Sequence, residues 1–173
     1  VQMPQRSQII GSLYSIGDTY TDLNGDGKSD YFVAASRDGA IRFTYFYSNG
    51  SGFSAKNTAE FSGDFILFGE IFATYGRVKS PFVVADVNGD GKTDVVTLLQ
   101  TPVERIYDVA VFLSTGTGFE QQVWAKNIQF NAWCAGGIDI LDSSKTTFGC
   151  LPVMLAGDFD GDGRQDIVLN NHA

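Results

Sequence analysis

Three acidic loops of equal length carry the residues with the most evident chemistry in this chain. They occupy residues 22–30, 86–94 and 158–166, with the sequences DLNGDGKSD, DVNGDGKTD and DFDGDGRQD. Each places a side-chain oxygen at positions 1, 3, 5 and 9 and a glycine at positions 4 and 6. Oxygen ligands on a short, sharply turning backbone are typical of Ca²⁺ sites, because this hard cation prefers carboxylate, amide and carbonyl oxygens. The loops therefore predict three calcium sites.

Each predicted site uses the side chains at positions 1, 3, 5 and 9 and the backbone carbonyl at position 7. The charged side chain at position 7 is expected to point to solvent and to reduce the local negative charge. The predicted ligands are Asp22, Asn24, Asp26, Lys28 and Asp30; Asp86, Asn88, Asp90, Lys92 and Asp94; and Asp158, Asp160, Asp162, Arg164 and Asp166.

The net charge of the chain agrees with this prediction. The loops hold half of its 20 acidic residues, and the formal net charge is −8. Carboxylates held this closely repel one another unless a cation lies between them. Three divalent ions would cancel six of these eight charges. The acidic residues are therefore interpreted mainly as metal ligands and not as a surface for a basic partner. The acidity and the lack of a Lys/Arg stripe argue against a nucleic-acid partner.

Two other kinds of calcium-binding loop have a similar sequence pattern. An EF-hand needs a bidentate carboxylate at position 12 and flanking helices, and cellulosome dockerins likewise need an oxygen ligand there and a helix. Position 12 is Val33, Thr97 or Leu169 here, within runs that resemble strands. Both alternatives are therefore disfavoured.

The segments around the loops predict a repeated all-β unit. An apolar run enters each loop, a β-branched or aromatic run leaves it, and in two units a further strand, a glycine-containing hairpin tip and a return strand follow. The runs that enter the loops are 13–21, 81–85 and 153–156, those that leave are 31–35, 95–99 and 167–169, and the tips lie in 46–53 and 112–119. About four antiparallel strands per unit is the content of one β-propeller blade.

The repeats divide one region, residues 1–173, into segments of approximately 10–79, 80–150 and an incomplete 151–173. We expect about two and a half to three blades, whereas a closed propeller needs roughly four to eight. The chain also starts at Val1. The region is therefore predicted to be part of a larger propeller, within a longer chain, or to close by association as a homo-oligomer.

The loops and their flanking strands resemble the FG-GAP/VCBS repeat, which is found in integrin α-subunit propellers, bacterial surface proteins, some lectins and toxin-complex proteins. The short motifs that frame the repeat in this family are only partly kept. Ile16-Gly17 stands near the first loop, and Ala34-Ala35-Ser36 replaces the usual Gly-Ala-Pro. This departure leaves the subfamily open. The resemblance implies a seven- or eight-bladed propeller whose loops hold structural Ca²⁺, away from or beside the ligand surface.

Two smaller motifs allow alternative interpretations. Cys134 and Cys150 are the only cysteines, and they are either a disulfide that would contribute about 3 kcal/mol or two buried thiols. The segment 49–51 has the form of a glycosylation sequon. A type I′ hairpin turn explains this segment better.

Little in the sequence indicates an enzyme. The sole histidine is His172, and the four glutamates, Glu60, Glu70, Glu104 and Glu120, are not paired in a motif. A carboxylate pair of the glycosidase type stays open, because such pairs assemble in space. We therefore predict a module without catalytic activity of its own.

The leading hypothesis is a secreted or cell-surface calcium-stabilised propeller segment that binds a protein or glycan or acts as a scaffold. The alternative is an accessory propeller of a carbohydrate-active enzyme or toxin-complex protein, with the chemistry elsewhere. Aromatic residues that could stack on sugars or anchor a protein, although core positions explain them better, are Tyr45, Tyr47, Trp124 and Trp133. No apolar run of 18 residues is present, so no membrane insertion is expected.

Overall fold

The computed structural model describes residues 14–37, 39–63, 82–103, 106–129, 134–135, 147–148 and 153–170. Within these residues the secondary structure consists of β-strands joined by turns and loops, without a helix. The strands are β1 (Tyr14–Thr21), β2 (Asp30–Arg37), β3 (Ala40–Phe46), β4 (Asn57–Ser62), β5 (Phe82–Ala85), β6 (Asp94–Gln100), β7 (Ile106–Ser114), β8 (Phe119–Gln129), β9 (Cys134–Ala135), β10 (Thr147–Phe148), β11 (Val153–Gly157) and β12 (Asp166–Asn170).

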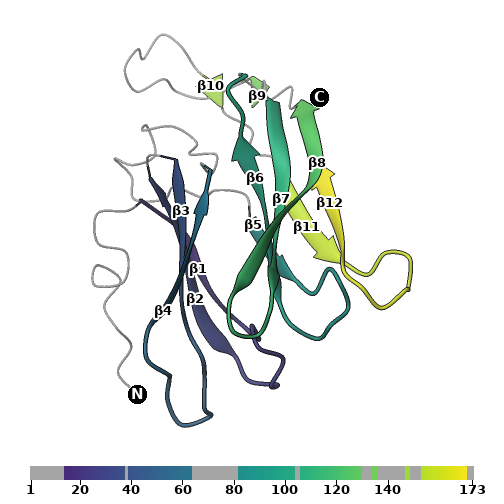
Figure 1. The fold of residues 1–173 in the computed structure, drawn as a ribbon. Helices are drawn as coiled ribbons and strands as arrows, with labels where there is room; N and C mark the ends of the chain where they lie inside the picture. The colour runs from purple at the N-terminus through teal and green to yellow at the C-terminus, as the bar shows by residue number, and fades with distance from the viewer. Residues whose placement is uncertain are drawn as a thin grey trace.

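The strands form consecutive antiparallel sheets (Figure 1). The first sheet has the order β1-β2-β3-β4, the second β5-β6-β7-β8 and the third β11-β12, while β9 and β10 form a short separate ladder. Each neighbouring pair is antiparallel, and strand order follows sequence order throughout. The predicted all-β fold of four-stranded, propeller-like blades is confirmed.

Burial along each strand follows its place in the sheet. The inner strand β6 is buried at every position from Asp94 to Leu99. The outer strand β4 instead alternates between half-buried and exposed residues. A strand covered on both faces needs a continuous apolar run, whereas a strand with one solvated face alternates. This difference explains why the sequence reads VVTLL in one strand and NTAEFS in the other.

The first and second sheets pack face to face through an aromatic cluster. Phe32, Phe43 and Phe112 are fully buried there. The ring of Phe43 lies 4.8 Å from that of Phe112 and 5.2 Å from that of Phe119, both in edge-to-face arrangements. Such arrangements are favoured because the positive edge of one ring meets the negative face of the next.

The second and third sheets pack through smaller aliphatic side chains. Val96 and Leu98 of β6, together with Val87 in the turn between β5 and β6, are buried beside Met154 of β11. Ala156, Ile167 and Leu169 of the third sheet pack against this cluster. The same sheet-on-sheet arrangement therefore occurs twice in succession along the chain.

One local prediction is wrong. The hairpin tip at residues 48–53 is not a type I′ turn, because that turn needs two residues with positive φ. Here Gly50 has φ 86°, and Asn49 is not among the residues with positive φ. The tip is closed instead by the side chain of Asn49, whose Oδ1 accepts the N–H groups of Ser51 and Gly52 at 3.0 and 2.7 Å.

No helix in the described part of the chain is long and apolar enough to cross a membrane.

Candidate metal sites in three stacked loops

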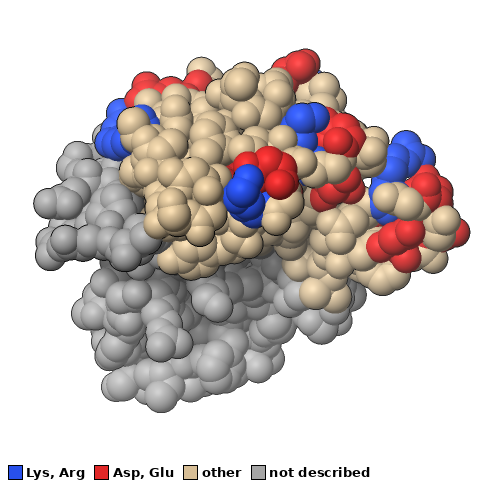
Figure 2. All heavy atoms as spheres, turned by 90° about the horizontal axis from the view of Figure 1, so that it is seen from below, with Lys and Arg blue, Asp and Glu red and all other residues tan. Residues whose placement is uncertain are grey.

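The three acidic loops lie at the same end of their sheets. Loop 1 (22–30), loop 2 (86–94) and loop 3 (158–166) join β1 to β2, β5 to β6 and β11 to β12. Seen from that end, acidic and basic side chains gather in successive mixed clusters (Figure 2). The two glycines of loop 1 have φ 74° and 79°, a left-handed conformation that explains why glycine occupies positions 4 and 6.

The aspartate at position 1 organises each loop around its own carboxylate. Asp22 accepts the N–H groups of Gly25 and Asp26 on Oδ1, at 2.8 and 3.1 Å, and that of Gly27 on Oδ2, at 2.8 Å. Asp86 accepts the three corresponding N–H groups in loop 2. The loop therefore turns because its backbone donors converge on one side chain.

The residue at position 3 adds a second local bond. Oδ1 of Asn24 accepts the N–H of Asp26 at 3.0 Å. Asn88 and Asp160 accept the N–H at position 5 of their loops in the same way. An amide or a carboxylate serves equally here, which is why both residue types occur at this position.

At position 7 the cationic side chain is partly exposed to solvent, as predicted. In all three loops it also pairs with the carboxylate at position 5. The pairs are Lys28–Asp26 at 2.8 Å, Lys92–Asp90 at 2.9 Å, and Arg164–Asp162. One residue, a glycine, separates the partners, so the side chains reach each other across the turn. The hydrogen bond from Lys28 lowers the pKa of Asp26, and that from Arg164 lowers the pKa of Asp162.

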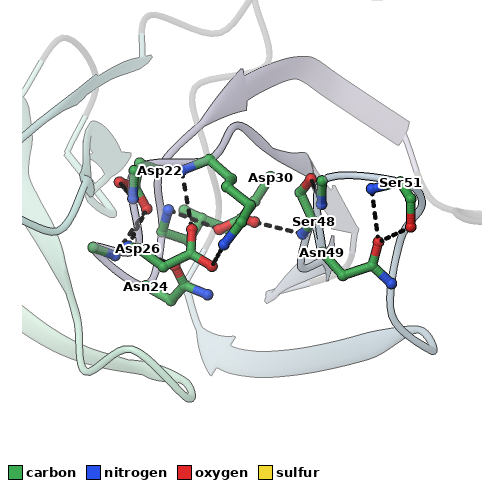
Figure 3. Close-up of polar contacts among 12 residues, drawn as sticks. Asp22, Asn24, Asp26, Asp30, Ser48, Asn49 and Ser51 are labelled. Carbon is green, nitrogen blue, oxygen red and sulfur yellow. Dashed lines mark hydrogen bonds and ion pairs between the residues drawn. The ribbon is translucent and has the colours of Figure 1, made fainter.

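The aspartate at position 9 fastens loop 1 to the next hairpin of its sheet. Asp30 is fully buried, and its Oδ2 accepts the N–H of Leu23 at 3.0 Å. Its Oδ1 accepts the N–H of Ser48, at the hairpin tip, at 2.7 Å (Figure 3). The same carboxylate therefore closes the loop and attaches it to the tip that joins β3 to β4.

Loop 2 repeats this attachment. Asp94 is fully buried and accepts the N–H groups of Val87 at 3.1 Å and Ser114 at 2.7 Å. The loop motif itself gives no sign that the two tip serines, Ser48 and Ser114, contact it. A signal was present, since a serine stands at the same place in the matching tips 46–53 and 112–119.

Burial makes the charge on these position-9 carboxylates unfavourable. The pKa of Asp94 is raised to about 6, chiefly by burial and in smaller part by the negative charges of Asp90 and Asp86, against the lowering effect of its two N–H partners. Burial also raises the pKa of Asp30. A cation held beside such a carboxylate would favour its ionised form.

Loop 3 brings three carboxylates together. Asp158, Asp160 and Asp166 place oxygen atoms within 4.8 Å of one another. Asp162 is not in this group, and its carboxylate bonds Arg164. Every atom that these side chains offer to a metal is an oxygen, so the residues present fit a hard cation such as Ca²⁺.

Successive loops are joined to each other by backbone hydrogen bonds. The N–H of Thr93 in loop 2 donates to the carbonyl of Asp22 in loop 1, at 2.8 Å. The N–H of Gln165 in loop 3 donates to the carbonyl of Asp86 in loop 2, at 2.9 Å. Both donors stand at position 8 and both acceptors at position 1, so the loops form a regular series. Because the groups are backbone atoms, no side-chain pattern could have predicted these bonds.

The remaining candidate residues are placed as follows. Tyr45 is buried in the core, Tyr47 packs against it, and Trp124 is 49% exposed. Glu60 pairs with Arg42 across β3 and β4. Outside the described residues, or with side chains that are not described, lie Trp133, Cys134, Cys150, Glu70, Glu104 and His172. The disulfide therefore stays a prediction.

Four-stranded antiparallel sheets that follow one another, each with an acidic loop between its first and second strands, define a repeat protein of the β-propeller type. Residues 22–97 match the model of the FG-GAP-like repeat family. This match confirms the resemblance inferred from the loops over loops 1 and 2. Comparison with curated proteins and with solved structures found no match.

Proposed function

We propose that the chain is a calcium-stabilised segment of a β-propeller that acts outside the cell as a binding or scaffold module. The observation that supports the proposal is the set of three loops at one end of the structure. Each loop holds the same side-chain oxygens, which can act as metal ligands. The group of Asp158, Asp160 and Asp166 supports a cation there. In each loop the proposed ligands are the oxygens at positions 1, 3, 5 and 9 and the carbonyl at position 7.

A bound calcium ion would neutralise these carboxylates and tie the strand that enters a loop to the strand that leaves it. Because an ion held only by the folded chain stabilises that state, its affinity would add directly to the free energy of unfolding. The pair between Asp90 and Lys92 places a cationic group on the same carboxylate, so the side chain of Lys92 has to yield if Asp90 contributes Oδ2.

The extracellular setting follows from the expected affinity of the loops. Calcium sites of extracellular modules typically have dissociation constants of about 10⁻⁴ to 10⁻³ M. Such sites would be filled at extracellular calcium levels and largely empty in the cytosol. A protein that depends on them would therefore work at the cell surface or in the medium.

The partner we favour is a protein, and a glycan is the second candidate. The exposed ring of Trp124 supports either, because an aromatic face packs on sugars and anchors protein contacts alike. Catalysis by this chain is not proposed. Chemistry elsewhere in a larger carbohydrate-active enzyme or toxin-complex protein stays the alternative, which a hydrolase or toxin module in the same reading frame would favour.

Thermal unfolding in millimolar Ca²⁺ and in excess EDTA tests the calcium proposal. We expect a clearly lower melting temperature in EDTA. The variant Asp90→Ala should lower the melting temperature in calcium and lower it less in EDTA. Glu60→Gln, which changes an exposed carboxylate outside the loops, is the control and should give equal effects in both buffers. Unchanged melting of the parent chain in EDTA would contradict the proposal.

Glycan-array binding distinguishes the two partner classes. Binding of a defined glycan that is lost in EDTA would establish a lectin and displace the protein partner as first choice. The variant Trp124→Ala then reports whether the exposed ring is in the contact.

A further inference from the structure

Three asparagines in the chain stand directly before a glycine: Asn24, Asn49 and Asn88. The backbone nitrogen of a following glycine can attack the side-chain carbonyl carbon of an asparagine, because glycine has no side chain to hinder the approach. The attack expels the side-chain amide nitrogen. Asn24 and Asn88 lie at position 3 of loops 1 and 2, whereas Asn49 lies at the tip between β3 and β4. The structure surrounds the three pairs differently.

In the two loops the glycine nitrogen is held by a carboxylate. The N–H of Gly25 donates to Oδ1 of Asp22 at 2.8 Å. The N–H of Gly89 donates to Oδ1 of Asp86, also at 2.8 Å. A hydrogen bond to a charged acceptor is stronger than one to a neutral acceptor. The attacking nitrogen must also lose its proton, which a neighbouring negative charge opposes. Both loop nitrogens are therefore poor nucleophiles.

The loop glycines are also confined by the next loop of the series. A Cβ on Gly25 would lie 3.2 Å from the carbonyl oxygen of Gly91 in loop 2. A Cβ on Gly89 would lie 2.9 Å from Cγ of Arg164 in loop 3. Ring closure requires the backbone to rotate around the glycine, and close packing resists such a rotation.

At the hairpin tip the glycine nitrogen is held much less firmly. The N–H of Gly50 donates to the hydroxyl oxygen of Ser48 at 3.2 Å, which is a long bond to an uncharged acceptor. A Cβ on Gly50 would meet only the side chain of Lys28 within 4 Å, at 3.8 Å. This nitrogen is therefore freer to attack than its two counterparts.

The side-chain carbonyl of Asn49 is also the most strongly polarised of the three. Its Oδ1 accepts the N–H and the hydroxyl of Ser51, both at 3.0 Å, and the N–H of Gly52 at 2.7 Å (Figure 3). Among the described residues, Oδ1 of Asn24 and of Asn88 each accept only the N–H at position 5. Negative charge develops on this oxygen during the attack, and donors aimed at it stabilise that charge.

We propose that Asn49 is the site at which the folded chain deamidates, and that the loops protect Asn24 and Asn88. The nitrogen of Gly50 bonds to Cγ of Asn49 and gives its proton to solvent, and ammonia leaves from Cγ, so a succinimide ring forms. Water then opens the ring at either carbonyl and yields aspartate or isoaspartate. Either product adds a negative charge to the tip, and isoaspartate also lengthens its main chain by a methylene. Asn49 and Asn88 are both exposed, so hydrogen bonding and packing set this order.

Ageing of the folded chain in mildly alkaline buffer, followed by digestion with trypsin and mass spectrometry, tests the proposal. Trypsin separates the three sites into peptides 7–28, 43–56 and 80–92, each with a single asparagine. We expect the Asn49 peptide to gain one mass unit at least about tenfold faster than the others, which corresponds to about 1.4 kcal/mol of activation free energy. In urea that unfolds the chain, the three rates should be similar.

A matched pair of variants tests the role of the donors. Ser51→Ala removes the hydroxyl that donates to Asn49 and should slow its deamidation severalfold. Thr117→Ala removes a hydroxyl at the corresponding position of the second tip and should leave the rate unchanged. Equal effects of the two variants on this rate would overturn the proposal.

The order of the three rates is the decisive readout. Equal rates in the folded chain, or a faster reaction at Asn24 or Asn88, would overturn the proposal. The same order is expected in millimolar Ca²⁺ and in EDTA, each below the melting temperature of the chain, because the loop bonds form without an ion. Protection of the loop asparagines in calcium alone would assign it to the ion and would also overturn the proposal.

Discussion

Loops 2 and 3 share a motif but differ in their surroundings. They share internal bonds: Gly89 and Gly161, for example, donate to the position-1 carboxylate at 2.8 and 2.7 Å. Their burial does not match. At position 2, Val87 of loop 2 is 5% exposed, whereas Phe159 of loop 3 is 63% exposed.

The difference shows which features of a loop are set by its own sequence and which by its neighbours. The motif folds each loop upon itself, because its donors and acceptors are at most a few residues apart. Burial comes from the neighbours: Val87 packs in the core shared by the second and third sheets. Leu155, Phe159 and Val168 of the third sheet are exposed. Among the described residues, loop 3 thus lacks the neighbouring sheet and the hairpin tip that surround loop 2.

The largest effect is expected from removal of the position-9 carboxylate. Asp94→Ala leaves the N–H groups of Val87 and Ser114 buried without an acceptor, at about 1–3 kcal/mol each. Asp166→Ala removes one bond, to Phe159, in a more open setting and should cost clearly less. Urea unfolding of both variants in EDTA measures the difference in the free energy of unfolding. Equal losses would mean that the tip contact contributes nothing.

A smaller effect is expected at the position-4 glycines. Gly89 and Gly161 have φ 78° and 81°, so alanine at either costs about 1–2 kcal/mol. A Cβ on Gly89 would also lie 2.9 Å from Cγ of Arg164 in loop 3, whereas one on Gly161 would meet nothing within 4 Å. Gly89→Ala should therefore lower the melting temperature more than Gly161→Ala. The reverse order would place the two loops further apart than the structure has them.

The smallest effect is expected from the ion pairs within the loops. Lys92→Met breaks the pair with Asp90, whose partners are partly shielded, and should cost below about 1 kcal/mol in EDTA. Arg164→Met breaks the more exposed pair with Asp162 and should leave the unfolding curve unchanged. Raising the salt concentration should abolish the Lys92 effect. If the loss of stability persists at high salt, it comes from packing of the aliphatic part of the Lys92 side chain and not from its charge.

The sequence predicted the loops and the strands well because both are local patterns. DLNGDGKSD fixes the bonds of Asp22 within five residues, and the apolar runs of β2 and β6 follow from burial on two faces. The prediction that failed concerns a side chain with two available roles. Asn49 caps its own tip rather than entering a type I′ turn.

The contacts that the sequence did not reveal are long-range and mostly backbone. Ser48 and Ser114 contact the loops through N–H groups 18 and 20 residues away from Asp30 and Asp94. Thr93 and Gln165 join the loops through N–H groups that every residue but proline carries. Such bonds do not depend on which residue types are present. They can be predicted only when the register of the strands is known.

The series of bonds from position 8 to position 1 also gives the structure a direction. Loop 2 is an acceptor toward loop 3 and a donor toward loop 1, so each repeat has a head and a tail. An added repeat can continue this series only head to tail, with its position-8 N–H on the carbonyl of Asp158. Such heterologous contacts generate closed rings or helical filaments, whereas a two-fold dimer would set like ends against each other. If copies of this chain do assemble through their loops, rotational order above two is the symmetry that the hydrogen bonds permit.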